Sequence, residues 1–93
     1  MSKITESAKD QNCQIRIPNV CNFNPETTVF CHLGGAGIAL KNSDLHGAYG
    51  CSNCHLIVDG GKTEHSRSKI VLWFFQAMIR TQIILLENGL IKI

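Results

Sequence analysis

The sequence contains few charged residues, and this scarcity excludes several classes of protein. Charged residues occupy 17% of its 93 positions, whereas hydrophobic residues occupy 44%. A disordered segment would be polar or highly charged, so we expect a folded chain. The formal net charge of +2 is also too small to indicate a nucleic-acid binder by itself. DNA binding would therefore depend on a local basic patch.

Two kinds of targeting segment are also missing. Residues 1–20 contain no apolar stretch of signal-peptide length and no small-residue cleavage site. The longest apolar stretch, residues 70–86, is interrupted by polar residues at positions 76 and 80–82. It falls short of the roughly 20 apolar residues that cross a membrane. We therefore expect a cytoplasmic protein in a reducing compartment, without a membrane partner.

Cysteine, in contrast, is abundant for so short a chain. The 93 residues allow one domain, residues 1–93, whose small core needs a metal, disulfides or a partner for added stability. Five cysteines stand at positions 13, 21, 31, 51 and 54. An odd number leaves one thiol outside any closed set of disulfides, and in a reducing compartment paired cysteines more often bind metal.

The spacing of four cysteines predicts a structural zinc site. Cys51 and Cys54 form a C-x2-C pair at the start of a predicted helix, whose N-terminus favours negative charge. Cys13 and Cys21 flank a turn at Pro18-Asn19, which can bring both sulfur atoms to one point. The alternative is that Cys13 or Cys21 is a small buried hydrophobic residue. Four thiolates and one Zn²⁺ carry a charge of about −2, so the zinc-loaded protein would be close to neutral.

The remaining sequence predicts an α+β domain. Residues 1–12 are predicted to form an N-terminal helix or tail, and residues 13–58 the zinc knuckle and a ββα core, with β signals between residues 13 and 32. Residues 66–88 form a long predicted helix, because apolar residues recur at three- and four-residue spacing. This helix is more apolar than one buried face requires, so some of its surface stays exposed or meets a second copy in a homodimer.

Two histidines stand in the order of a ββα-metal nuclease site. His32 ends a predicted strand, a glycine-rich loop follows, and His55 lies in the helix that begins with C-x2-C. In that chemistry a divalent ion on the helix histidine stabilises charge on the scissile phosphate. The strand histidine takes a proton from water. Asp44, in the loop, is a candidate second metal ligand or a residue that orients His32.

Each of these residues also has an ordinary structural interpretation. A lone histidine is usually a surface or capping group, and a loop aspartate usually accepts a hydrogen bond in a turn. Cys31 adjoins His32, but adjacent residues of a strand point to opposite faces. We therefore expect Cys31 to fill space in the core rather than to act as a nucleophile.

The basic residues are densest just after the predicted metal-binding helix. Lys62, Arg67 and Lys69 are predicted to contact the DNA backbone there. The alternative is a solvated helix start, which short charge runs usually are. In that case the DNA face would involve Arg16 and Lys41.

Four motifs follow one another between residue 11 and the C-terminus: C-x-I-R-I-P, V-C-N-x-N-P-E-T, C-S-x-C-H and R-T-Q-x-I-x-L. Together they resemble the small lambdoid-phage proteins that include YbcO, a family of nucleases of the HNH-like, His-Me finger type. The resemblance implies a small zinc-stapled ββα-metal (HNH-like) domain with a long C-terminal helix. It also implies metal-dependent hydrolysis of DNA, in a phage or prophage setting inside a bacterial host cell.

Carried over residue by residue, the resemblance supports the four-cysteine zinc site, His32 as the general base and His55 as the ligand of a catalytic Mg²⁺, Mn²⁺ or Zn²⁺. Two positions depart from the HNH pattern. Cys31 stands where many HNH enzymes have an acidic ligand, and the middle asparagine has no clear match, with Asp44 and His46 the nearby polar residues. A zinc-binding module that binds DNA, or a phage recombination or replication protein, without catalysis is therefore the alternative. The enzyme would bind a second, exchangeable ion, whereas the module would bind zinc alone.

Overall fold

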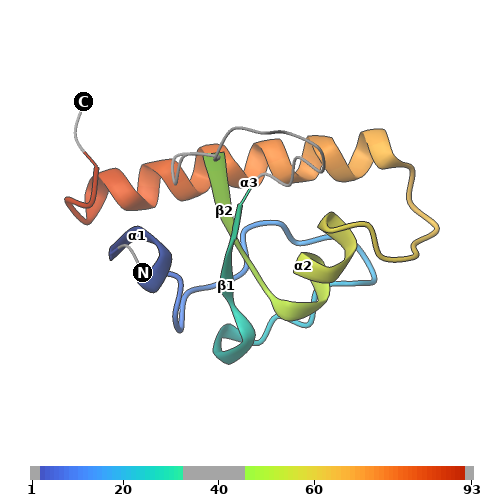
Figure 1. Ribbon diagram of the computed structural model, residues 1–93, viewed down its shortest axis with the longest axis horizontal. Coiled ribbons are helices and arrows are strands. Elements are labelled where there is room, and N and C mark those ends of the chain that lie inside the picture. The colour runs from blue at the N-terminus through green and yellow to red at the C-terminus, as the bar shows by residue number, and fades with distance from the viewer. Residues whose placement is uncertain (1–2, 33–45, 92–93) are drawn as a thin grey trace.

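The computed structural model describes residues 3–32 and 46–91, which form an α+β arrangement. Figure 1 shows the longest helix, α3, along one side of the molecule and the other elements gathered against it. The elements in chain order are α1 (Lys3–Glu6), a 3-10 turn η1 (Pro25–Thr27), β1 (Val29–His32), β2 (Gly47–Gly50), α2 (Ser52–Val58) and α3 (Arg67–Glu87).

The strands β1 and β2 pair as an antiparallel hairpin, with His32 opposite Gly47. The β-branched and aromatic residues that precede His32 favour this extended conformation. Gly50 lies where the hairpin meets the segment before it. A Cβ at Gly50 would stand 2.6 Å from Cδ1 of Ile15 and 2.8 Å from Sγ of Cys31. Only glycine allows so close an approach.

The helix α2 follows β2 almost directly, which gives the predicted strand–strand–helix order. Cys51 is its N-cap, and the Cys51 sulfur accepts a hydrogen bond from the backbone N–H of Cys54 at 3.4 Å. The helix ends at Asp59-Gly60, where Gly60 adopts φ 109°. Glycine takes this left-handed conformation without a steric penalty.

The β signals between residues 13 and 28 do not produce a strand. Arg16, Asn19 and Phe23 adopt φ values of 52°, 63° and 53°, which break the extended backbone. Ile15 and Ile17 are nevertheless buried on either side of exposed Arg16. Their alternation therefore reflects burial along an irregular segment. The predicted N-terminal helix is also short, because only the single turn of α1 is helical.

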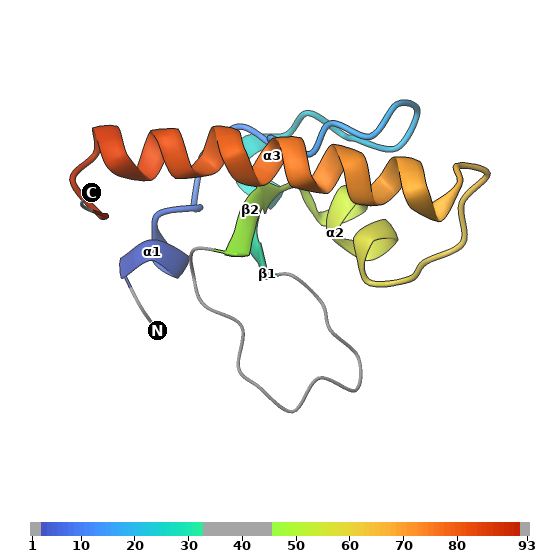
Figure 2. The same cartoon turned by 90° about the horizontal axis from the view of Figure 1, so that it is seen from above.

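The long helix predicted for residues 66–88 is confirmed as α3. The Ser66 hydroxyl accepts a hydrogen bond from the backbone N–H of Lys69 at 3.3 Å, and Asn88 caps the other end. Figure 2 shows that α3 runs past the hairpin and α2. The buried face of α3 consists of Ile70, Phe74, Ala77, Thr81 and Leu85. The Thr81 hydroxyl accepts a hydrogen bond from the backbone N–H of Tyr49 at 3.1 Å, which fastens β2 to the helix.

A second face of α3 is apolar and exposed. We call it the outer face of α3; its side chains are 38% to 56% exposed and belong to Val71, Leu72, Phe75, Ile79, Ile83 and Leu86. The apolar residues of α3 that exceed one buried face therefore lie at the surface. By length and composition alone, α3 is long and apolar enough to cross a membrane, with a mean hydropathy of 1.5 over 18 residues. Of that window 28% is buried, and one such helix by itself is weak support for a membrane span.

Candidate metal centre and active site

The structure brings together the four cysteines that the sequence assigned to zinc. The sulfur atoms of Cys13, Cys21, Cys51 and Cys54 all lie within 4.8 Å of one another. Those of Cys21 and Cys51 are 3.8 Å apart. A tetrahedral zinc site with Zn–S bonds of about 2.3 Å has sulfur–sulfur edges of about 3.8 Å. The cluster therefore fits one tetrahedral metal ion such as Zn²⁺, and all five cysteines are free of disulfides.

Local backbone geometry aims these sulfur atoms at one point. In the knuckle (residues 13–21), the N–H groups of Val20 and Cys21 donate to the carbonyl of Ile17 at 3.1 and 3.0 Å, which closes a tight turn. The backbone N–H of Arg16 points to the Cys13 sulfur at 3.5 Å. Cys51 and Cys54 are presented by the first turn of α2. The site thus ties the knuckle to the strand–helix junction.

Hydrogen bonds within the cluster favour the ionised form of Cys13 and the protonated form of Cys54. A hydrogen bond from the Cys54 thiol, together with N–H groups of Arg16 and Cys51, lowers the pKa of Cys13 to about 4 despite its burial. The same bond holds the proton on Cys54, whose pKa is raised well above its ordinary range. Burial raises the pKa of Cys21 to about 11. A bound metal would displace the remaining protons, because the thiolate is the form that coordinates.

Cys31 is the thiol outside the cluster. Its side chain is fully buried, in the same apolar cluster as Ala48 and Ile57. Burial, and then the negative charges of Cys13 and Asp59, raise the pKa of Cys31 to about 12. A thiol that keeps its proton is a poor nucleophile, and the Cys31 sulfur is not among the four that lie within 4.8 Å of one another. Its burial agrees with the expectation that Cys31 fills space in the core.

His32 ends β1, opposite Gly47 of β2. Its ring packs edge-on against Phe30, with ring centres 5.0 Å apart. Phe30 belongs to a second apolar cluster with Tyr49 and Leu85, whereas Cys31 packs with the residues of α2. Because side chains alternate along a strand, His32 and Cys31 face opposite sides. His32 therefore shares a face of β1 with Phe30, and Cys31 lies on the other face.

His55 contacts the carboxylate of Asp59, which was not among the predicted metal ligands. Its Nε2 lies 3.2 Å from Oδ2 of Asp59, one helical turn further on, and both side chains are about half exposed. Asp59 is also the C-cap residue of α2. The i,i+4 spacing of His55 and Asp59 was the available signal, since residues four apart meet on one helix face. Together they offer an imidazole nitrogen and a carboxylate oxygen to a cation. The Asp44 candidate lies outside the described residues.

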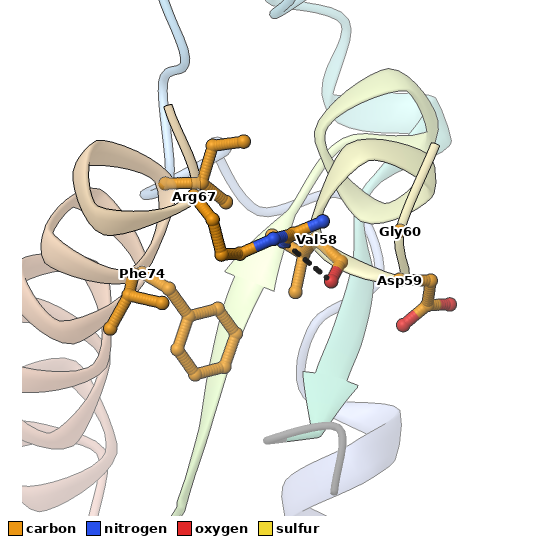
Figure 3. Close-up of a pocket in the computed structure, with 7 residues that line it drawn as sticks. Val58, Asp59, Gly60, Arg67 and Phe74 are labelled. Atoms are coloured by element: carbon orange, nitrogen blue, oxygen red, sulfur yellow. Dashed lines mark hydrogen bonds between the residues drawn. The ribbon is translucent and has the colours of Figure 1, made fainter. Parts of the chain in front are cut away.

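The three basic residues assigned to DNA do not share one environment. Arg67 reaches from the start of α3 to the end of α2, where its Nη1 donates to the carbonyls of Ile57 and Val58 at 3.5 and 3.4 Å. Figure 3 shows the contact between Arg67 and Val58. Both residues line a pocket of about 260 Å³. A cation is favourable there because the C-terminus of a helix carries partial negative charge. Lys62 and Lys69 are exposed. Arg67 is exposed as well, but it also links α3 to α2, so Lys62 and Lys69 are the candidates for phosphate contact without a second role.

Comparisons with known proteins agree on one relationship. The sequence profile of the family described as "Putative nuclease YbcO" matches residues 2–90. "Putative nuclease YbcO" of Escherichia coli (strain K12) and "Putative nuclease ybcO" of Enterobacteria phage 82 are each 37% identical over 95 residues, covering 99% of this chain and 99% of theirs. A solved structure described as "Structure of a putative bacteriophage protein from Escherichia coli str. K-12 substr. MG1655" matches with a TM-score of 0.80 and 36% identity, over 91% of this chain and 98% of that one.

Proposed function

The chain belongs to the family "Putative nuclease YbcO", and from that premise we propose that it is a metal-dependent DNA nuclease of the HNH-like, His-Me finger type. The observation that carries the proposal is the hairpin–helix unit. A histidine ends β1, and α2 presents a His–Asp pair next to the four-cysteine cluster. The relatives named as nucleases, one of them from a phage, supply the substrate class and the phage setting.

In this proposal each residue has a defined role. His55 and Asp59 would hold a divalent ion such as Mg²⁺, Mn²⁺ or Zn²⁺, which stabilises negative charge on the scissile phosphate. Asp59 thereby supplies the carboxylate that the strand lacks at Cys31. His32 takes the proton from the attacking water.

The alternative is a zinc-binding module without catalysis, which binds DNA or a phage recombination or replication protein. It is favoured by one observation, the buried and neutral Cys31 in place of an acidic ligand. Both functions belong in the cytoplasm of a bacterial host, where five free thiols persist. The two hypotheses differ in whether an exchangeable ion binds at His55.

Removing either member of the His–Asp pair should weaken cleavage in a way that added metal restores. We expect His55→Ala and Asp59→Asn to cut plasmid and branched DNA about 10- to 100-fold more slowly at low metal, as loss of a metal-site group usually does. Higher Mg²⁺, Mn²⁺ or Zn²⁺ should recover part of the rate. The assay follows cleavage across a titration of each ion.

Asp10→Asn is a matched control for this experiment. Asp10 is exposed, lies outside the pair and adopts φ 64°, a conformation that asparagine tolerates. It should cleave like the wild type. Wild-type rates for His55→Ala and Asp59→Asn at every ion concentration would contradict the assigned ion site. An absence of cleavage by the wild type with all three ions would favour the non-catalytic module.

A second copy of the chain is the partner that we assign to the outer face of α3. This face contains no charged side chain and runs about 22 Å from Val71 to Leu86 at 1.5 Å per residue. An apolar helix face without charges can pack against the same face of a second copy across a two-fold axis.

Sedimentation should give a mass that rises with protein concentration from 10.3 kDa toward twice that value. Ile79→Glu should stay monomeric, whereas Lys3→Gln, which makes the same change in net charge outside α3, should behave as the wild type.

A further inference from the structure

The most exposed large hydrophobic side chain of the described residues lies beside the zinc knuckle rather than on α3. Phe23 is 75% exposed, and it borders a cleft of about 320 Å³ with Asn12, Cys13 and Arg16. We propose that this cleft is a subsite for one unpaired nucleotide, with the base stacked on the Phe23 ring and the phosphate bound by Arg16. The inference rests on the proposed action on DNA and adds where the strand is held.

Core packing does not account for the position of Phe23. Its ring is mostly in solvent, and its backbone adopts φ 53°, which is unfavourable for a residue with a bulky side chain. Glycine or asparagine would satisfy that backbone conformation more readily. Strained residues that bury nothing are typical of ligand sites, where the exposed group makes its contacts on binding.

The turn that carries Phe23 is rigidly held on both sides. Oδ1 of Asn22 accepts hydrogen bonds from the backbone N–H of Asn24 at 2.8 Å and from the hydroxyl of Thr27 at 3.2 Å. Nδ2 of Asn22 donates to the Ser52 hydroxyl at 3.3 Å, which links the turn to α2. The ring is therefore presented by a preorganised loop, and less conformational entropy is lost when a base stacks on it.

Arg16 supplies a fixed cation at the same cleft. Its Nε donates to the carbonyl of Cys13 at 3.1 Å, and its Nη2 donates to Oε1 of Gln14 at 3.3 Å. These bonds use two of the five N–H donors of a guanidinium group, and the others are available to a phosphate oxygen. Arg16 also adopts a left-handed backbone, φ 52°, so two strained residues border one cleft.

An aromatic ring beside a guanidinium group suits a nucleotide whose base is not paired. A base inside a duplex offers only its edges, whereas an unpaired base offers a flat face to a ring. Stacking on an aromatic side chain is strong and tolerates any base sequence. A single cation next to the thiolate cluster gives modest attraction for phosphate. We therefore expect stacking at Phe23 to contribute more than charge at Arg16.

The test compares substitutions at Phe23 in the His32→Ala background, without added divalent ions, so that cleavage does not enter the measurement. Phe23→Leu keeps an apolar side chain but removes the ring, and it should bind a labelled single-stranded oligonucleotide about 5- to 100-fold more weakly. Phe23→Trp should bind at least as tightly as the parent. Arg16→Gln should weaken binding and flatten its salt dependence by about 0.7 log units. Zinc content and thermal unfolding confirm that each variant is folded.

Equal affinity of Phe23→Leu and its parent for the single strand would overturn the proposal. It would also be overturned if only Lys62→Gln/Lys69→Gln weakened binding, which would place the DNA along the start of α3. Binding is measured without cleavage, so the comparison at Phe23 does not depend on catalytic activity. A wild type that does not cleave DNA would refute the proposed nuclease activity, and the binding result could still be interpreted. Loss of binding in Phe23→Leu supports the subsite whether or not the protein cleaves DNA.

Discussion

Replacing Cys51 with alanine should abolish the cooperative unfolding of this protein. Structural zinc sites supply on the order of 10 kcal/mol of folding free energy, and small domains have a total stability of about 5–15 kcal/mol. The four sulfur atoms join the knuckle to the strand–helix junction, so the loss of one ligand separates both segments. We expect no stoichiometric zinc in the purified variant and a broad, weak thermal transition by circular dichroism.

Cys31→Ala is the matched control, because it removes a buried cysteine that lies outside the cluster. A small cavity should lower its stability by about 1–2 kcal/mol, with zinc retained. A zinc chelator should unfold both the wild type and Cys31→Ala. If the purified wild type contains no zinc and stays folded in chelator, the structural zinc site is refuted.

Replacing His32 with alanine should slow DNA cleavage by about 10²- to 10⁴-fold, the usual contribution of a general base. DNA binding should be unchanged, because the proton is taken in the reaction and not in the binding step. The measurements are the single-turnover cleavage rate with saturating metal and the affinity for uncleaved DNA. Raised metal should not rescue this variant, in contrast with His55→Ala.

His65→Ala provides the comparison for His32→Ala. The His65 ring forms a hydrogen bond to the carbonyl of Pro18 at 2.8 Å and packs on Trp73, which ties the knuckle to α3. Its loss should lower thermal stability while the cleavage rate of the folded protein is retained. Equal cleavage by His32→Ala and the wild type with every ion would exclude His32 as the base.

The parts of the fold that could be predicted from sequence are those fixed by nearby residues. The ends of α3 follow from a serine cap and an Asn88-Gly89 stop, and its buried face follows from the spacing of apolar residues. The cysteine cluster was predictable because C-x2-C on a helix start and a turn between Cys13 and Cys21 constrain the sulfur positions strongly.

The other features depend on contacts that sequence patterns do not contain. The alternation of Ile15 and Ile17 predicted a strand, but Arg16 adopts a left-handed backbone that tertiary packing and the cluster impose. The exposure of Phe23 also depends on how that segment folds. Asp59-Gly60 is a strong turn signal, and the contact of Asp59 with His55 becomes evident only in the folded helix.

The outer face of α3 has a consequence for how the protein behaves at high concentration. Repulsion between like-charged molecules keeps proteins dispersed, and a net charge near zero promotes association. The zinc-loaded chain has a formal charge close to zero near pH 7, so little repulsion opposes contact between uncharged helix faces. Colloidal stability should therefore be lowest near neutral pH. Addition of acidic residues along this face would raise solubility without touching the zinc cluster or the His–Asp pair.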